Sequence, residues 1–239
     1  MILKNEIDFS VIQYIRMQIY KIGATKTAID ALSDKLISAL RLGPTLWFVS
    51  GGTNIPLSVS AMRQIDAELT PNLTIALADE RFVSYDDPSS NLKQLKDAGF
   101  DSKKGKIIEV LKEQPKSLEN TLEDYQRVIE TIMRDSKNII GQFGMGIDGH
   151  IAGILPYSLA ANTTDDLFTA YVSNPYTRIT ITFNGIKRIN TVFLIALGKN
   201  KFTSLENLIN HDLSLNEQPA QIIKQISEAY VYNDQMEDN

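Results

Sequence analysis

Short apolar runs alternate along the chain with segments of helical spacing. Three of these runs are apolar at nearly every position, over 45–49, 73–78 and 191–197, and a further strand is expected over 138–143. Runs this short and continuous are typical of strands buried on both faces of a parallel sheet. Because helical segments separate them, the pattern predicts an α/β fold: a doubly wound, largely parallel sheet with helices on both faces, in a Rossmann-like three-layer α/β/α arrangement.

The other expected elements are less regular. Helical spacing occurs twice within 8–42, with a break at Gly23, and again over 117–136. Further helices are expected over 59–69, 91–98, 199–209 and 219–227, and further strands over 106–110, 177–183 and 229–232. Residues 156–176 look most like loop. We expect one domain over 1–239, with a small C-terminal lobe as an open alternative.

Composition narrows the chemistry. The chain of 239 residues contains no cysteine, which excludes disulfides, Cys-ligated zinc, iron–sulfur clusters and thiol nucleophiles. It contains two histidines, His150 and His211, so a three-histidine metal site within one chain is excluded as well. The net charge of −5 argues against a general nucleic-acid or anionic-membrane surface. No signal peptide or membrane-spanning run is evident, so the cytoplasm is the expected location.

Three polar motifs directly follow predicted buried strands, where ligands bind in open parallel sheets. The first is Ser50-Gly51-Gly52-Thr53-Asn54-Ile55-Pro56. Its glycines allow close approach of a ligand, its hydroxyls can donate, and the next helix presents free N–H groups. This combination suits a phosphate group. A tight strand-to-helix turn is the plainer interpretation, and the motif alone does not choose between them.

The second motif is Asp79-Glu80-Arg81. A charged triplet is often a solvated turn, but this one ends an apolar strand. Arg81 can bind a phosphate or carboxylate through two hydrogen bonds, with Asp79 or Glu80 holding it in place. Ser90-Asn91 then begins a helix, where an N-cap is expected.

The third motif, over 144–150, places Asp148 and His150 two residues apart among glycines. A carboxylate beside a histidine fixes its tautomer and raises its basicity, so we favour an acid–base pair over a capping Asp and a structural His. His211, at a predicted helix end, is interpreted as a surface or C-terminal cap residue. Arg178, Lys199 and Lys201 lie near strand boundaries. They either supply charge to an anion or lie on solvated faces.

In this order the motifs resemble the 6-phosphogluconolactonase family and its wider superfamily with glucosamine-6-phosphate isomerase/deaminase. Two departures stand out: one extra residue precedes Pro56, and Ile-Ala-Gly-Ile-Leu-Pro follows His150 where Thr-Ala-Ser-Leu-Phe-Pro is commoner. The motifs that carry the resemblance are SGGTNIP (50–56), DER (79–81), SN (90–91), GMGIDGHIAGILP (144–156), RIT (178–180) and GKNK (198–201).

The resemblance implies an enzyme, a carboxylic ester hydrolase that converts 6-phospho-D-glucono-1,5-lactone to 6-phosphogluconate in the oxidative pentose phosphate pathway. It implies His150 as the base that activates water and Asp148 as its orienting partner. It implies no metal or organic cofactor and a small sugar phosphate as the ligand. We also expect no nucleic-acid or membrane partner, and a monomer or small homo-oligomer. The expected substrate- or phosphate-binding residues are Ser50, Gly51, Gly52, Thr53, Asp79, Arg81, Asn91, Gly149, Arg178 and Lys201.

Two alternatives stay open. The amino-sugar-phosphate isomerase/deaminase branch typically carries Asp-Glu-Tyr where this chain has Asp79-Glu80-Arg81. It also has Phe-Asn-Glu-Pro after His-Ile-Ala, where this chain has Gly153-Ile154-Leu155-Pro156. The missing glutamate favours the lactonase. A non-catalytic sugar-phosphate-binding protein would need the phosphate loop without His150.

Overall fold

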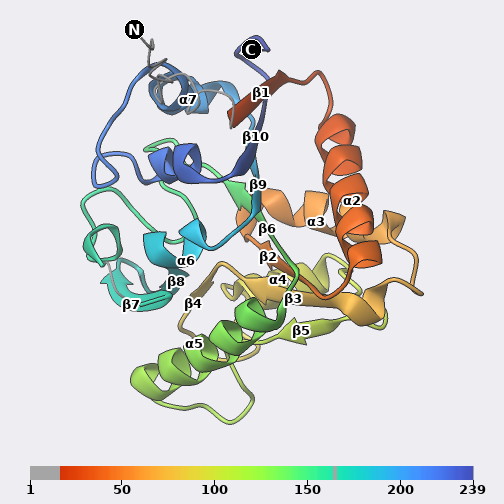
Figure 1. Cartoon of the computed structure of the whole chain (residues 1–239). Coiled ribbons are helices and arrows are strands. Elements are labelled where there is room, and N and C mark those ends of the chain that lie inside the picture. Colours follow the sequence, from red (N-terminus) through yellow and green to blue (C-terminus); the bar gives the residue numbers. More distant parts are fainter. Residues whose placement is uncertain (1–16, 164–165, 239) are drawn as a thin grey trace, which may run out of the picture.

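A seven-stranded parallel sheet forms the centre of the molecule (Figure 1). The computed structural model describes residues 17–163 and 166–238. The strand order is β1-β10-β9-β6-β2-β3-β5, and every neighbouring pair is parallel. The strands are β1 Met17–Lys21, β2 Thr45–Val49, β3 Leu73–Leu77, β5 Lys106–Ile108, β6 Asn138–Gly144, β9 Thr191–Ala196 and β10 Glu228–Asn233.

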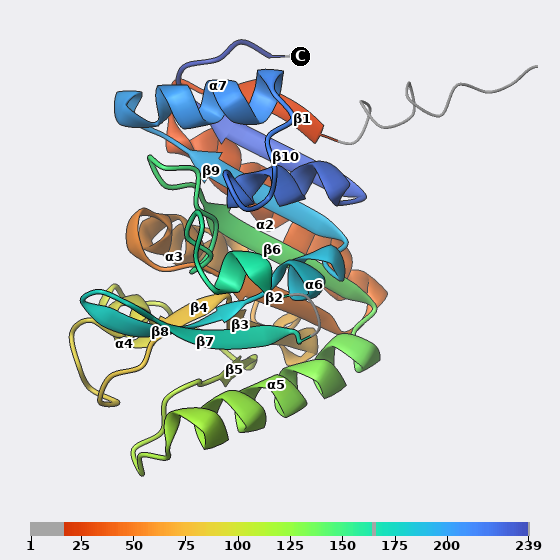
Figure 2. The same ribbon diagram turned by 90° about the vertical axis from the view of Figure 1, so that its left-hand side faces the viewer.

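Helices cover both faces of this sheet. Helices α2 and α3 lie on one face, and α5, α6 and α7 lie on the other (Figures 1 and 2). Strands β2 and β9 are buried at every position, as their continuous apolar runs predict. The predicted doubly wound α/β fold is confirmed. The helices are α2 Thr25–Leu42, α3 Ile55–Gln64, α4 Asn91–Asp97, α5 Leu118–Asp135, α6 Phe183–Lys187 and α7 Phe202–Asn210, with 3₁₀ turns at Gly52–Asn54, Thr70–Asn72, Ala160–Asn162, Lys199–Lys201 and Pro219–Gln225.

A second, antiparallel sheet was not predicted. It has the order β4-β8-β7, formed by β4 Asp79–Arg81, β8 Tyr176–Ile181 and β7 Phe168–Ser173. The interpretation of 156–176 as loop was therefore wrong over β7. The charged triplet 79–81 is also a strand and not a turn. Both strands depend on pairing with β8, a long-range contact that local spacing does not reveal.

The N-terminal helical interpretation was also wrong in part. Residues 8–16 lie outside the described residues, and Met17–Lys21 is an edge strand that pairs with β10. The strand has five residues, and only Ile19 is buried. So short a segment does not give a clear period-two pattern of apolar residues. Helix α3 ends at Gln64, before the predicted limit at 69. In the part of the chain that the structure describes, no helix has the length and apolar character needed to cross a membrane.

Candidate active site

The site lies at the carboxyl ends of four adjacent strands. The chain passes from β2 to β3 in one direction across the sheet and from β6 to β9 in the other, so the sheet order reverses between β2 and β6. Ligands of open α/β sheets bind at such a switch point. A cavity of about 410 Å³ opens there. Its lining includes ten of the twelve residues predicted for the site: Ser50, Gly51, Gly52, Thr53, Asp79, Arg81, Asn91, His150, Arg178 and Lys201.

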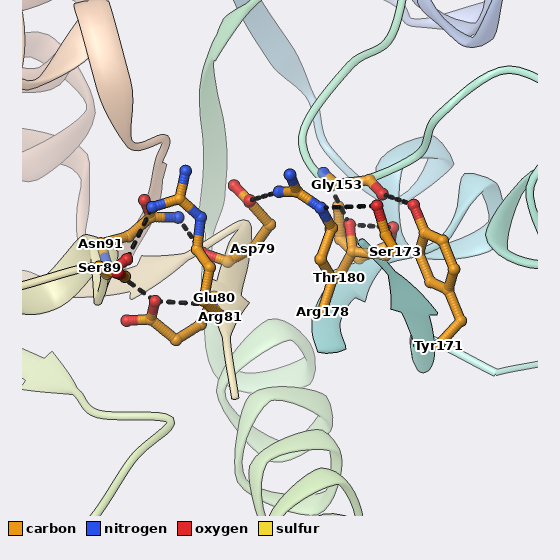
Figure 3. A network of polar contacts seen from close by, with 11 residues as sticks. Asp79, Glu80, Arg81, Ser89, Asn91, Gly153, Tyr171, Ser173, Arg178 and Thr180 are labelled. Atoms are coloured by element: carbon orange, nitrogen blue, oxygen red, sulfur yellow. Dashed lines mark hydrogen bonds and ion pairs between the residues drawn. The ribbon is translucent and has the colours of Figure 1, made fainter. Parts of the chain in front are cut away.

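The β4–β8 register gathers the charged groups of this cavity. Asp79 lies opposite Thr180, and Arg81 lies opposite Arg178. Residues two apart in a strand share one face, so all four side chains belong to the same side of the small sheet. The Asp79 carboxylate lies between the two guanidinium groups, with its Oδ2 3.7 Å from Arg178 Nη1 (Figure 3). Burial raises the pKa of Asp79, and the charges of Arg178, Arg81 and His150 act in the opposite direction.

Each guanidinium group is also held by neutral partners. Arg81 Nη1 donates a hydrogen bond of 2.7 Å to the carbonyl oxygen of Ser89, and its guanidinium lies 5.7 Å from the ring centroid of Tyr176. Arg178 Nε donates to Ser173 Oγ at 3.4 Å. Like charges directly opposite each other in a sheet are destabilising unless negative charge compensates them. Asp79 supplies one such charge, so the pair of arginines suits a further anion in the cavity.

Asp148 and His150 form a hydrogen-bonded pair. His150 Nδ1 lies 2.7 Å from Asp148 Oδ1, and this bond lowers the pKa of the Asp148 carboxyl. With Nδ1 engaged by a carboxylate, Nε2 is the nitrogen that remains to accept a proton. A β-carbon on Gly146 would lie 2.1 Å from His150 Nδ1, so only glycine permits the imidazole to pack there. The expected acid–base pair is therefore present in geometry.

The loop that carries His150 is attached to the small sheet. The Gly153 N–H donates to Thr180 Oγ1 at 2.9 Å, and Tyr171 Oη donates to the Gly153 carbonyl at 2.6 Å (Figure 3). Strands β7 and β8 thus hold both the loop of His150 and the side chain of Arg178. Gly149, expected among the binding residues, does not line the cavity. Its φ of +81° suits glycine in a turn.

Unpaired polar atoms concentrate in the cavity wall. Ser50 Oγ, Arg81 Nε and Asn91 Oδ1 are buried and have no hydrogen-bond partner among the described residues. Buried polar atoms normally have partners, so these three atoms are candidates to bind a polar ligand. Asn91 Nδ2 donates to the Asp79 carbonyl, which fixes the amide. Ser90 caps α4 by accepting from the Lys93 N–H, as predicted.

The remaining lysine and histidine residues that the sequence suggested for the site differ in whether they line the cavity. Lys201 lines the cavity, and burial lowers the pKa of its ammonium group. Lys199 and Asp148 do not line the cavity, although Asp148 reaches it through His150. His211 ends helix α7, as predicted, and its carbonyl accepts from Gln221 Nε2.

Sequence reasoning left six lining residues out of the candidate set. Five of them lie in the glycine-rich motif that carries His150, and its glycines were the signal that could have found them. Asn54 lies inside the phosphate-loop motif. The six are Asn54, Gly144, Met145, Gly146, Ile147 and Ala152.

A larger hollow, of about 640 Å³, lies on another part of the surface beside Met17, Ile209 and Leu213. Its two charged lining residues, Asp212 and Lys224, pair with each other at 2.8 Å. It therefore offers an anion less than the smaller cavity does.

The fold and the smaller cavity define an α/β protein with a cavity at the switch point of its sheet, lined by Arg81, Arg178 and Lys201. Residues 24–232 match the family model described as glucosamine-6-phosphate isomerases/6-phosphogluconolactonase, so the chain belongs to this family. The predicted family resemblance is confirmed.

Individual relatives agree with this membership. The 6-phosphogluconolactonase of Neisseria meningitidis is 27% identical over 186 residues, which cover 74% of this chain and 80% of that protein. The structure of 6-phosphogluconolactonase from Thermotoga maritima has a TM-score of 0.71 at 23% identity, covering 91% of this chain and 99% of that chain. A monomeric glucosamine-6-phosphate deaminase has a TM-score of 0.74 at 18% identity, covering 92% and 98%. The fold alone therefore does not separate the two activities.

Proposed function

We propose that this protein hydrolyses 6-phospho-D-glucono-1,5-lactone to 6-phosphogluconate. The observation that carries the proposal is the juxtaposition of Arg81 and Arg178 with the Asp148–His150 pair around one cavity. The arginines favour an anionic ligand, and the pair supplies a base beside it. The curated relatives that match over most of this chain are named 6-phosphogluconolactonases. We further propose a cytoplasmic enzyme of one domain, a monomer or small homo-oligomer.

The proposed reaction needs one base, one phosphate anchor and positive charge. The loop of Ser50–Thr53 and Lys201 bind the phosphate. His150 Nε2 takes a proton from water as the water oxygen adds to the lactone carbonyl carbon, while Asp148 stabilises the imidazolium. Arg178 and Arg81 stabilise the negative charge on the carbonyl oxygen. The bond from this carbon to the ring oxygen then breaks, and the ring oxygen takes the proton from His150.

The sequence of the loop after His150 favours the lactonase over the deaminase. The deaminase branch carries Phe-Asn-Glu-Pro where this chain has Gly153-Ile154-Leu155-Pro156, and here the Gly153 N–H is bound by Thr180. Leu155 stands where the deaminase branch has its glutamate, so this loop supplies no carboxylate there.

The deciding experiment couples glucose-6-phosphate dehydrogenase to the purified protein and follows loss of the lactone. We expect hydrolysis well above the spontaneous rate, measured in a blank without protein. Ammonia release from glucosamine 6-phosphate, assayed in parallel, is expected to be absent. Ammonia release without lactone hydrolysis would refute the proposal in favour of the deaminase, and binding of 6-phosphogluconate without turnover would favour a non-catalytic protein.

Replacing Asp148 by asparagine tests the acid–base pair through pH. The pKa of Asp148 is lowered by the hydrogen bond to His150, so its carboxylate stays ionised through the neutral range and favours the imidazolium. A neutral amide removes that charge. We therefore expect the acidic limb of the kcat/KM profile to move to lower pH and kcat to fall on the order of 10²-fold.

The control for this profile is Asp212→Asn, which replaces a surface carboxylate whose pKa is lowered by Lys224. It is expected to leave the profile unchanged. An acidic limb at the same pH in Asp148→Asn and the unmodified protein would show that Asp148 does not act on the base.

A further inference from the structure

Asn54 immediately precedes helix α3 but does not cap it. Asparagine at this position usually accepts a hydrogen bond from the first turn of the helix. Here Asn54 has helical backbone angles, φ −83° and ψ −18°, because the 3₁₀ turn Gly52–Asn54 runs directly into the helix. Its side chain makes no capping bond. The amide is therefore engaged elsewhere.

Two buried polar residues fix the orientation of this amide. Gln142 Nε2 donates to the Asn54 carbonyl at 3.3 Å and to its Oδ1 at 3.4 Å. Ser58 Oγ donates to Gln142 Oε1 at 2.8 Å. The backbone carbonyl of Asn54 can only accept, so Gln142 must present its NH₂ group there, and Oδ1 of Asn54 must face it. The Asn54 NH₂ group therefore lies on the other side.

That NH₂ group lies beside Gly144, which also lines the cavity. Asn54 is only 2% exposed but belongs to the cavity lining. Its Nδ2 has no hydrogen-bond acceptor among the described residues, yet it is not one of the fully enclosed unpaired atoms. A β-carbon on Gly144 would lie 2.4 Å from Nδ2, so the bare glycine makes room for the amide. The result is a rigidly held neutral donor in the wall of the site.

The donor lies between the two ends of the proposed site. Asn54 directly follows Thr53 of the phosphate loop, and its Nδ2 packs on Gly144, two residues before the glycine that contacts His150. A ligand with its phosphate at the loop and its reacting carbon at His150 passes its sugar carbons between these points. Charged groups serve the phosphate, whereas a fixed neutral amide is suited to a hydroxyl oxygen.

We infer that Asn54 is a specificity-determining residue whose Nδ2 donates a hydrogen bond to a hydroxyl oxygen of the bound sugar phosphate. The inference rests on the proposed function, because it takes a phosphorylated polyhydroxy acid or its lactone as the ligand. A site built to bond a hydroxyl group discriminates strongly against ligands that lack it, since its buried donor is then left unpaired.

Calorimetric binding to Asn54→Ala tests this inference. The probes are 6-phosphogluconate, which carries hydroxyls, and inorganic phosphate, which does not. We expect the variant to bind 6-phosphogluconate about 10- to 100-fold more weakly and inorganic phosphate within twofold of the unmodified protein. If Asn54→Ala folds poorly, Asn54→Leu replaces it, because leucine keeps the side-chain volume. The same binding pattern is expected for Asn54→Leu. Thermal unfolding checks the fold of both.

Two results would overturn the inference. One is unchanged 6-phosphogluconate affinity in a folded variant. The other is an equal loss of affinity for both probes, which would mean that Asn54 binds the phosphate. Either result leaves the proposed function standing if the unmodified protein hydrolyses the lactone. Failure of the unmodified protein to hydrolyse the lactone would refute the proposed function alone, whereas its failure to bind 6-phosphogluconate would refute the inference about Asn54.

Discussion

Replacing His150 by alanine is expected to lower kcat for lactone hydrolysis by about 10²- to 10⁴-fold, the usual contribution of a positioned general base. The imidazole is part of the cavity wall and is paired with Asp148 at 2.7 Å. Its loss removes the proposed proton acceptor. The loop itself is held by backbone contacts, including the bond of 3.0 Å from the Gly146 N–H to the carbonyl of residue 150, so the fold is expected to persist.

The other histidine of the chain provides a matched control. His211→Ala changes a residue at the end of α7, outside the cavity lining, and is expected to retain full activity. Affinity for inorganic phosphate is expected to be nearly unchanged in both variants, because the phosphate loop and Lys201 remain. Turnover is measured against a blank without protein. Near-normal turnover in a folded His150→Ala protein would remove His150 from the mechanism.

Replacing Glu80 by alanine is expected to lower the free energy of unfolding by about 3–5 kcal/mol. Glu80 is fully buried on the face of β4 opposite to Asp79 and Arg81. Its truncation leaves several buried donors without an acceptor. Oε1 accepts from the N–H groups of Arg81 and Asn91, both at 2.7 Å, and Oε2 accepts from Leu92 N–H at 3.0 Å and Ser90 Oγ at 2.9 Å.

The pH dependence of stability gives an independent check. Burial raises the pKa of Glu80 above its ordinary value. Protonation is therefore more favourable in the folded state, and the stability that it contributes is present below the ordinary pKa and lost as the pH rises through the raised one. In denaturant titrations at several pH values, the difference in free energy of unfolding between the unmodified protein and Glu80→Ala is expected to shrink as the pH rises, because Asp79, whose pKa burial also raises, contributes to both proteins.

Two comparison variants separate the loss of hydrogen-bond acceptors at Glu80 from the loss of its charge. Glu80→Gln keeps the shape but turns an NH₂ group toward the donors, and an intermediate loss is expected. Glu109 pairs with Lys96 at 2.6 Å near the surface, and Glu109→Gln is expected to cost less than about 1 kcal/mol. A loss below about 1 kcal/mol in Glu80→Ala would mean that the network does not hold α4 against β4.

The central strands could be predicted because burial on both faces makes them apolar throughout. β2 and β9 meet this condition at every position. β7 does not: four of its six residues retain exposed surface, and its structure depends on pairing with β8. β4 is three polar residues whose strand conformation comes from the same partner, about 100 positions away in the sequence.

The site could be predicted where chemistry is concentrated in a local motif. The loop after β2 shows its glycines and hydroxyls directly in the sequence, and the loop after β6 shows its glycines, Asp148 and His150. The orientation of the Asn54 amide could not be predicted, because its partner Gln142 lies in strand β6, far from Asn54 in the sequence. That Glu80 and Asp79 lie on opposite faces of β4 could not be predicted either, because the pairing register with β8 determines the two faces.

The pairing of β4 with β8 also has a consequence for the order of folding. Asp79 and Thr180 are about 100 residues apart in sequence, and closing so long a loop costs conformational entropy before any contact repays it. Neighbouring strands β2 and β3, joined through one helix, can associate earlier. By this argument Arg81 and Arg178 come together after β2 and β3 have paired. The repulsion between them then opposes the closing of this loop and not the earlier pairing of β2 with β3.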